Sequence, residues 1–482
     1  MKTILPVLLL LVAGSAFAAD PISLQLISPD ALNDALQMDW RVVVTNDSAT
    51  DAPSVFLMFE TFQGHGVVHA PEGCVLRFNY ECTVAVPAHA SRELVFTTVA
   101  NQQYGRFEVY TQSSSPLTVE RDAVIFGRPY TVTNIDDSGP GSLRQAILDM
   151  NRDCTSWFDP CSIAFDISEP ATIRPTSALP QITAPVFSIY GRSQTRAHGE
   201  ANPVRLDGSD LMDGHGLSIR ATWADLRDLE IERFPRNGID SAAFTTIRRC
   251  DVSRNRARGI ELYEQNSVVT DNVLSDNAHA GGFFWIDGAI DVRRNRVTGN
   301  GASGLFFHNT VAFGYRFADV RDNLIENNAH AGIGLTAFAS GNFARNVMVG
   351  NHNGAIDIGL DGPTLESKSG NPGLGGIIGA PVITSAKFEN GVTTIEGRVG
   401  ARSGALVLND AIYVYANTRE ASDAEELIGT LDRATTAGTL TLRVDRDLRG
   451  RWITASEYST WIYDFDHAAQ GTSEVGPPRI VE

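Results

Sequence analysis

The stretch DNVLSDNAHAGG, residues 271–282, is written almost a second time as DNLIENNAHAGI, residues 322–333. Each copy leads into a glycine that opens a short apolar segment, such as GIEL, GLFF or GIGL, whose alternation predicts a strand with one buried face. Equivalent glycines recur at steps of 22, 21, 22, 23, 28 and 22 residues: Gly216, Gly238, Gly259, Gly281, Gly304, Gly332 and Gly354. A repeat of this length predicts a solenoid, in which each unit needs its neighbours to complete a core.

The solenoid is predicted to be a parallel β-helix, because the units are too short for paired helices and lack a leucine-rich signature. Asparagine supports this choice, since successive rungs lie ~4.8 Å apart and stacked amides can hydrogen-bond along the axis. One column contains Asn272, Asn295, Asn323 and Asn346, with Cys250 in the same slot one rung earlier. A second column contains Asn255, Asn277, Asn300, Asn328 and Asn351. Both columns are interpreted as structural.

Charge and the N-terminus indicate an exported protein. The 482 residues carry a net charge of −18, which disfavours nucleic acid and anionic membranes as partners. Lys2, an apolar run over 4–12 and an Ala-x-Ala cleavage site at Ala16 and Ala18 predict a secretory signal peptide over residues 1–18. That run is far shorter than the ~20 residues of a membrane span. We therefore expect a secreted or cell-surface protein, with the periplasm as an alternative.

The five cysteines suit an oxidising compartment. The pairs Cys74–Cys82 and Cys154–Cys161 are close enough in sequence to close small loops as disulfides. Cys250 lies in an apolar strand and is predicted to be a free, buried thiol. The cysteines do not form metal-binding clusters with histidine, so no metal site and no cofactor is predicted.

Residues 130–381 resemble a known family. The segments VTNIDDSGPGSLRQAILDMN (132–151), PVRLDGS (203–209) and GAIDIGLDG (354–362) are similar to secreted bacterial right-handed parallel β-helix proteins of the pectate-lyase-like superfamily. The resemblance implies an all-β fold whose relatives include polysaccharide lyases, hydrolases and epimerases. In those relatives the exit loop is rich in aspartate, whereas PTLESKSGNPGLGG (363–376) is not, which weakens any inference of calcium.

The solenoid is expected to have a helical cap and two flanking domains. Ser142 and Gln145 predict a capping box for a helix over 143–150 that covers the open end. Alternating strands on both sides resemble immunoglobulin-like β-sandwiches. The predicted organisation is a signal peptide over 1–18, a sandwich over 19–128, the β-helix over 129–381 and a second sandwich over 382–482.

No motif supplies a complete catalytic set. RFPRNG (233–238) departs by one residue from a pectate-lyase motif, and DGHG (213–216) lacks the other polygalacturonase elements. His279 and His330 occupy equivalent turns two rungs apart, too far for a shared metal, and are interpreted as solvated. Whether the protein is an enzyme stays open.

One outward strip offers ligand contacts. Alternation after the repeat glycines points five side chains outward: Asp240, Glu261, Tyr263, Phe306 and His308. In GGFFWI either Phe283 and Trp285 or Phe284 and Ile286 face out, because a shift of one residue exchanges the faces. Acids beside aromatics suit sugar rings; alternatively, a loop over 310–317 covers the aromatics.

Asp240 and Glu261 are also weak catalytic candidates. Their backbones are expected ~4.8 Å apart, so mutual repulsion would raise one pKa, and a retaining glycosidase holds its carboxyl groups ~5–5.5 Å apart. The leading hypothesis is nevertheless a protein that binds extracellular polysaccharide or serves as a structural module. A polysaccharide lyase or glycoside hydrolase is the first alternative, and a protein-binding adhesin is the second.

Overall fold

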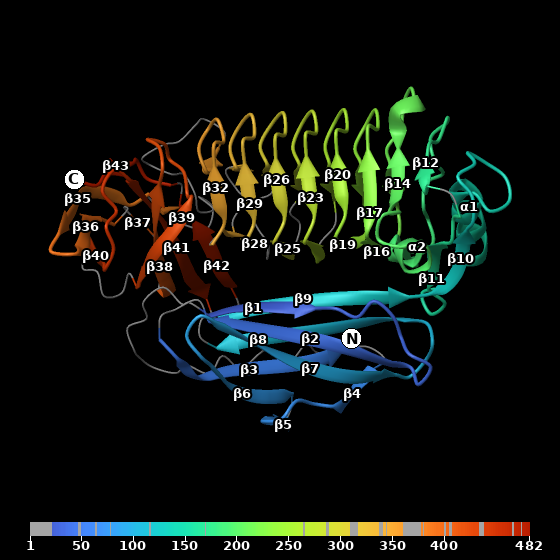
Figure 1. Ribbon diagram of the computed structural model, residues 1–482, viewed down its shortest axis with the longest axis horizontal. Helices are drawn as coiled ribbons and strands as arrows, with labels where there is room; N and C mark the ends of the chain where they lie inside the picture. Colours follow the sequence, from blue (N-terminus) through green and yellow to red (C-terminus); the bar gives the residue numbers. More distant parts are fainter. Residues whose placement is uncertain are drawn as a thin grey trace.

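The computed structural model describes residues 22–482 except 47–49, 63–64, 78, 115–116, 169, 264–265, 286–288, 309–316, 337–340, 344, 360–376, 379, 400–401, 404–406, 433–437, 465–466 and 474. The predicted signal peptide lies outside these residues. The described chain forms a solenoid of three parallel sheets, flanked by antiparallel sheets at both ends of the sequence. The solenoid lies lengthwise along the N-terminal sheets, and the C-terminal strands stand at its far end (Figure 1).

Three parallel sheets build the solenoid, which confirms the predicted parallel β-helix. Sheet 1 contains β10 Arg128–Val132, β11 Cys161–Phe165, β13 Val186–Tyr190, β16 Trp223–Arg227, β19 Phe244–Arg248, β22 Ser267–Thr270, β25 Ala289–Arg293, β28 Phe317–Arg321 and β31 Gly341–Asn342. Sheet 2 contains β12 Thr172–Ile173, β14 Val204–Asp207, β17 Leu229–Glu232, β20 Asp251–Ser253, β23 Val273–Ser275, β26 Arg296–Thr298, β29 Leu324–Glu326 and β32 Val347–Val349. Sheet 3 contains β15 Leu217–Ile219, β18 Ile239–Ser241, β21 Ile260–Leu262, β24 Gly282–Trp285, β27 Leu305–His308, β30 Ile333–Leu335 and β33 Ile356–Ile358.

Register places equivalent residues of successive repeats side by side. Ile239 pairs with Ile260 and Asp240 with Glu261, so one apolar column fills the interior while its neighbours face out. Each rung buries only a few side chains of its own and packs them against those of its neighbours. The core is therefore continuous along the axis, and it includes residues of the cap and of the C-terminal domain.

Both predicted asparagine columns are buried ladders. Asn272 donates through Nδ2 to Oδ1 of Asn295 at 2.9 Å, and Asn295 repeats this contact with Asn323 at 2.9 Å. The second column repeats the arrangement from Asn255 to Asn351. Cys250 is buried and free and ends the first ladder, as predicted, and burial raises the pKa of its thiol to about 12.

A column of alternating acids and arginines occupies the turn between sheets 1 and 2. All six residues have left-handed φ angles of 50–59°: Asp228, Arg249, Asp271, Arg294, Asp322 and Arg345. Each arginine reaches back one rung to the preceding aspartate, at 2.7, 3.0 and 2.8 Å. These ion pairs hold a backbone conformation that arginine rarely adopts alone.

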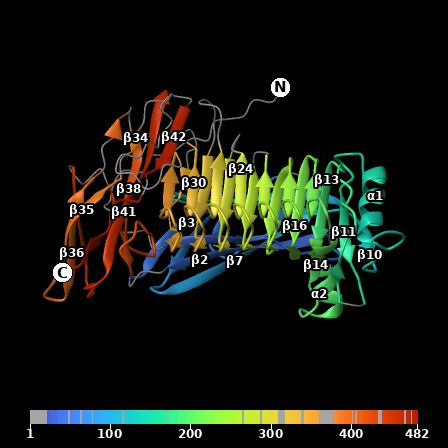
Figure 2. The same ribbon diagram turned by 90° about the horizontal axis from the view of Figure 1, so that it is seen from above.

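A helix closes the first end of the solenoid (Figure 2). Helix α1 spans Leu143–Asp153 and buries Leu143, Ala146, Ile147 and Met150 on the core. Ser142 caps it by accepting from the Gln145 N–H at 3.2 Å. The predicted reciprocal half of the capping box is wrong, because the Ser142 N–H donates to the Gly139 carbonyl at 3.2 Å instead of to Gln145. The other helices among the described residues are α2 Arg192–His198 and the 3₁₀ turn Gly208–Asp210.

Two antiparallel sheets around one core form the N-terminal sandwich. One sheet contains β1 Ile22–Ile27, β2 Gln37–Asn46, β7 Ala90–Ala100 and β4 His65–His69. The other contains β5 Cys74–Leu76, β6 Tyr80–Val86, β3 Ala52–Phe62, β8 Gly105–Ser114 and β9 Leu117–Phe126. Both predicted disulfides are present, Cys74–Cys82 between β5 and β6 and Cys154–Cys161 after α1.

Strand β9 docks the sandwich along the outer face of sheet 1 (Figure 1). Glu120 forms an ion pair with Arg293 at 2.8 Å and accepts from the Leu26 N–H at 3.1 Å. Arg121 donates to Asp291 at 2.9 Å, and Asp122 pairs with Arg248. The outer face of sheet 1 is therefore covered by another domain through buried charges.

Glu120 should make this docking sensitive to acid. Burial alone would raise the pKa of Glu120, but Arg293, Arg294, Arg321 and the Leu26 N–H lower it from 4.5 to about 2. A carboxyl group whose pKa is lower in the folded than in the unfolded protein stabilises the fold at any pH above its unfolded pKa. This stabilisation is lost as the pH falls through the folded pKa, and for Glu120 it corresponds to about 3 kcal/mol. We expect the gap in unfolding free energy between the wild type and Glu120→Gln to shrink by about that amount from pH 7 to pH 2. A gap independent of pH would contradict this expectation.

The C-terminal strands close the other end of the solenoid. They are β34 Ile377–Ile378 with β37 Arg402–Ser403; β35 Val382–Glu389, β36 Val392–Arg398 and β40 Thr439–Val444; and β39 Glu426–Asp432, β38 Val407–Asn417, β41 Trp452–Asp464 and β42 His467–Thr472, with β43 Arg479–Ile480 on β41. An antiparallel bridge joins Met348 of the last rungs to Ala424, and Ala355 donates to the Ser422 carbonyl at 2.9 Å. The boundaries at 19–128, 129–381 and 382–482 stay our proposal for the domain limits.

Candidate functional site

The outer face of sheet 3 brings the predicted strip together. Pairing aligns Ser218, Asp240, Glu261, Phe283 and Phe306 in one outward column. A second outward column, two residues further along each rung, contains Arg220, Ala242, Tyr263, Trp285 and His308. Phe284 is fully buried in the core, so Phe283 and Trp285 are the outward pair and the ambiguity of register is resolved.

The first rungs of this face carry a polar cluster. Asp240 accepts from Nη2 of Arg220 at 2.8 Å, and Glu261 accepts from Nη1 of Arg258 at 2.5 Å. One amide nitrogen of Asn237 lies 2.8 Å from Oε2 of Glu261 and 3.4 Å from Oδ1 of Asp240. The two carboxylates therefore lie close together, as their register predicts.

These carboxylates lie beneath the arginines. The side chains of Asp240 and Glu261 are only 5% exposed, whereas those of Arg220 and Arg258 are 39% and 33% exposed. Their outward direction does not leave these carboxylates in water, because each is held by a neighbouring cation. A ligand that approaches this face meets guanidinium donors first.

The pKa of Glu261 is lowered and not raised. Burial would raise it, but hydrogen bonds from Trp285, Tyr263 and Arg258, together with the charge of Arg258, lower the pKa of Glu261 below its ordinary value. Trp285 donates through Nε1 to Oε1 of Glu261 at 3.1 Å. The expected protonation by carboxylate repulsion is thus reversed at Glu261, because local cations and donors outweigh the neighbouring acid.

The later rungs carry stacked aromatic rings. Phe283 and Phe306 stack with centroids 4.9 Å apart, and Tyr263 and Trp285 stack at 5.8 Å. The guanidinium of Arg258 lies 3.9 Å from the centroid of Phe283. Because the inner ring faces pack on each other and on Arg258, the face presents a ridge of half-buried aromatic side chains beside the polar cluster.

The five predicted residues share this face, but sequence reasoning missed several neighbours. His215, Asn237 and Arg258 each directly precede a repeat glycine, where the next two rungs carry Ala280 and Ser303. This change from large polar residues to small residues within one column could have indicated that His215, Asn237 and Arg258 belong to the site. Arg220 was missed because it lies just beyond the end of β15.

Other sequence candidates do not join the site. His279 and His330 are exposed turn residues, and Arg236 forms an exposed ion pair with Asp213. The described residues contain no group of three or more side chains that could hold a metal ion. Most of the loop over 310–317 and all of the exit loop over 363–376 lie outside the described residues, so the covered-aromatics alternative stays untested.

A narrow cavity lies elsewhere, between the sandwich and sheet 1. Its walls include Arg121, Asp122, Trp223 and Phe244. We place the candidate site on sheet 3 instead, because the charged walls of this cavity include groups that already pair across the two domains.

Fold and face together define a parallel β-helix protein in which the outer face of sheet 3 carries a strip rich in hydrogen-bond donors. Residues 215–368 match the family described as right handed beta helix region, so this part of the chain is a right-handed β-helix. No curated protein matches the chain significantly. Among the described residues, the helices are too short or too polar to cross a membrane.

Solved structures give only distant likenesses. The A-module of Azotobacter vinelandii mannuronan C-5 epimerase AlgE4 is 11% identical, with a TM-score of 0.20, over 43% of this chain and 82% of that one. A Bacteroides uniformis β-glucuronidase is 8% identical, with a TM-score of 0.17, over 95% of this chain and 61% of that one. A putative β-galactosidase from Bacteroides fragilis is 8% identical, with a TM-score of 0.16, over 94% and 73%. These scores are too low to carry an argument about activity.

Proposed function

We propose that the protein is exported and binds extracellular polysaccharide through the outer face of sheet 3. The observation that carries the proposal is the strip itself, in which exposed guanidinium donors stand beside an aromatic ridge. Rungs spaced ~4.8 Å apart give the strip a length suited to several consecutive sugar units. Sugar hydroxyl and carboxylate oxygens would accept from the arginines, while C–H groups would pack on ring surfaces.

Two further observations support this proposal. Two disulfides are compatible with an extracellular or periplasmic location, as the predicted signal peptide requires. The net charge of −18 disfavours nucleic acid and anionic membranes as competing partners.

Removing aromatic contacts should weaken binding. We expect Phe306→Ala and Tyr263→Ala each to raise the Kd for a bound polysaccharide about tenfold, which corresponds to about 1.4 kcal/mol. Affinity electrophoresis over a polysaccharide panel measures this. Arg296→Ala is the matched control, because Arg296 lies outward on sheet 2 in an exposed ion pair with Glu326. Unchanged binding by both aromatic variants would show that the strip is not the site.

A polysaccharide lyase is the second candidate function. His215 lies near Asp240 and Glu261, its Nδ1 is buried without a hydrogen-bond partner among the described residues, and burial lowers its pKa. Burial and the hydrogen bond to Glu261 raise the pKa of Tyr263. A neutral histidine and a protonated tyrosine on one face are a base and a proton donor. A hydrolase is less well supported, since Glu261 lacks the raised pKa of a general acid. New unsaturated ends that disappear in Tyr263→Phe would support the lyase.

A further inference from the structure

The loop closed by Cys154–Cys161 displays two adjacent aromatic side chains at the capped end of the solenoid. Trp157 is 59% exposed and Phe158 is 91% exposed. Neither ring belongs to the face of sheet 3, since the loop leads directly into β11 of sheet 1. An exposed apolar patch with a polar rim is typical of an interaction site.

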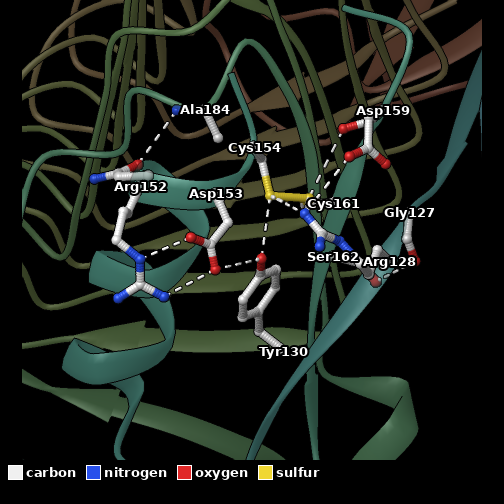
Figure 3. Close-up of a disulfide and its surroundings, with 11 residues drawn as sticks. Gly127, Arg128, Tyr130, Arg152, Asp153, Cys154, Asp159, Cys161, Ser162 and Ala184 are labelled. Carbon is white, nitrogen blue, oxygen red and sulfur yellow. Dashed lines mark hydrogen bonds and ion pairs between the residues drawn. A yellow bond between two sulfur atoms is a disulfide. The ribbon is translucent and has the colours of Figure 1, made fainter. Parts of the chain in front are cut away.

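The two ends of the loop are held in place by the disulfide and by hydrogen bonds. Both cysteines are buried, and the disulfide closes a short loop between α1 and β11. The Arg128 N–H donates to the Pro160 carbonyl at 2.9 Å. Ser162 donates through Oγ to the Gly127 carbonyl at 2.9 Å (Figure 3). A Cβ at residue 127 would stand 2.4 Å from the backbone carbon of Cys161, so only glycine lets the junction between the domains pass this closely.

Trp157 is also supported from below. Its ring meets Trp223 of β16 edge to face, with centroids 5.5 Å apart and an interplanar angle of 84°. The guanidinium of Arg106 lies 5.2 Å from the centroid of Trp223. Trp157 is thus anchored to sheet 1 while more than half of it stays open, so little order would have to be gained on binding.

Polar groups lie beside the disulfide that closes this loop. Arg128 and Asp159 form an ion pair at 3.5 Å with side chains 43% and 52% exposed. Tyr130 donates to Asp153 at 3.3 Å, and Arg152 pairs with Asp153 at 2.7 Å (Figure 3). A loop with two exposed rings and with exposed donors and acceptors at its disulfide suits the mixture of hydroxyl and C–H groups on a pyranose. A stable protein–protein interface buries roughly 800 Å² on each partner around an apolar centre. Two aromatic rings are too few to form such a centre.

We propose that this loop, through Trp157 and Phe158, is a second contact site for polysaccharide. The ring surfaces pack on pyranose C–H faces, and Arg128 and Asp159 hydrogen-bond to the hydroxyls. The class of ligand rests on the proposed function, but the site does not depend on sheet 3. When one polysaccharide chain binds at both sites, the second binding event is intramolecular, so the overall affinity exceeds that of either site alone.

Isothermal titration of the full chain tests the proposal, with hexasaccharides of cellulose, xylan and polygalacturonate and with the corresponding polymers as probes. We expect Trp157→Ala/Phe158→Ala to raise the Kd for a bound polymer at least tenfold. Trp157→Phe should retain most of the affinity, because it keeps a ring. Leu148→Ala is the matched control, since Leu148 is an exposed apolar residue on α1 at the same end.

The outcomes separate this proposal from the function proposed for sheet 3. Loss of polymer binding in Phe306→Ala, with unchanged binding in the double variant, overturns the loop site alone. Loss in the double variant, with unchanged binding in Phe306→Ala and Tyr263→Ala, supports the loop and overturns sheet 3. A wild type that binds no probe overturns both. Binding to phosphatidylcholine vesicles that the double variant abolishes would assign the loop to a membrane surface and overturn it as a glycan site.

Discussion

Asn295→Ala should lower the free energy of unfolding by about 3–5 kcal/mol. Asn295 is buried, and its Oδ1 accepts from the backbone N–H and the amide of Asn272 at 3.0 and 2.9 Å. Its own amide donates to Asn323 and to the carbonyls of Val269 and Arg293 at 2.9–3.0 Å. Alanine leaves several of these buried groups without a partner, and each orphaned group costs about 1–3 kcal/mol.

Urea unfolding followed by far-UV circular dichroism measures this loss. Asn353→Ala is the control, because Asn353 is a half-buried asparagine in a turn of the same solenoid, outside both ladders. We expect that control to change the free energy of unfolding by less than about 1 kcal/mol. An equally small change for Asn295→Ala would mean that the ladder adds no net stability beyond its backbone contacts.

Arg248→Ala should cost about 3–5 kcal/mol by stranding buried acids. The guanidinium of Arg248 is buried between the domains, where it pairs with Asp122, Ser28 and the Ala123 carbonyl and lies 3.4 Å from Asp225. Burial lowers the pKa of Arg248 and raises the pKa of Asp122, so desolvation opposes the charge on both partners. When only the cation is removed, the carboxylate of Asp122 stays buried, but the attraction to Arg248 that offset its desolvation is lost.

The double variant Arg248→Met/Asp122→Asn should recover most of this loss. It removes both charges while keeping similar volumes, and replacing a whole buried ion pair is often nearly neutral. Asp225 keeps its hydrogen bonds from Arg227, so no acid is newly stranded. Urea midpoints for the two single variants and the double variant give the coupling energy. A double variant as unstable as Arg248→Ala would show that the arginine acts through shape and packing.

The docked sandwich decides which face of the solenoid remains for a ligand. Sheet 1 is covered through Glu120, Arg121 and Asp122, and the outer face of sheet 2 carries exposed pairs such as Arg205 with Glu230 at 2.6 Å. Sheet 3 differs because its acids lie below its arginines and its aromatics gather on adjacent rungs. This contrast between faces is the reason for placing the proposed function there.

The sequence by itself determined the solenoid, the direction of the side chains and both disulfides. A repeat near 22 residues places equivalent residues one rung apart, so the glycine and asparagine columns already specified Asp240 beside Glu261 and Asn272 beside Asn295. Alternation then separated core from surface, except in GGFFWI. There four apolar residues in a row permit either register, and the structure decides it by packing Phe284 in the core.

Only the tertiary structure decided what covers each surface and which charges meet. Arg248 and Asp122 are 126 residues apart, and nothing local shows that an outward arginine of sheet 1 is buried by another domain. Arg220 forms its ion pair with Asp240 of the next rung, and Arg258 forms its ion pair with Glu261 from the preceding turn. The lowered pKa of Glu261 therefore depends on contacts that the alternation of a strand does not predict. Alternation fixes which way a side chain leaves a strand, whereas burial and protonation depend on the partners that long-range folding brings to it.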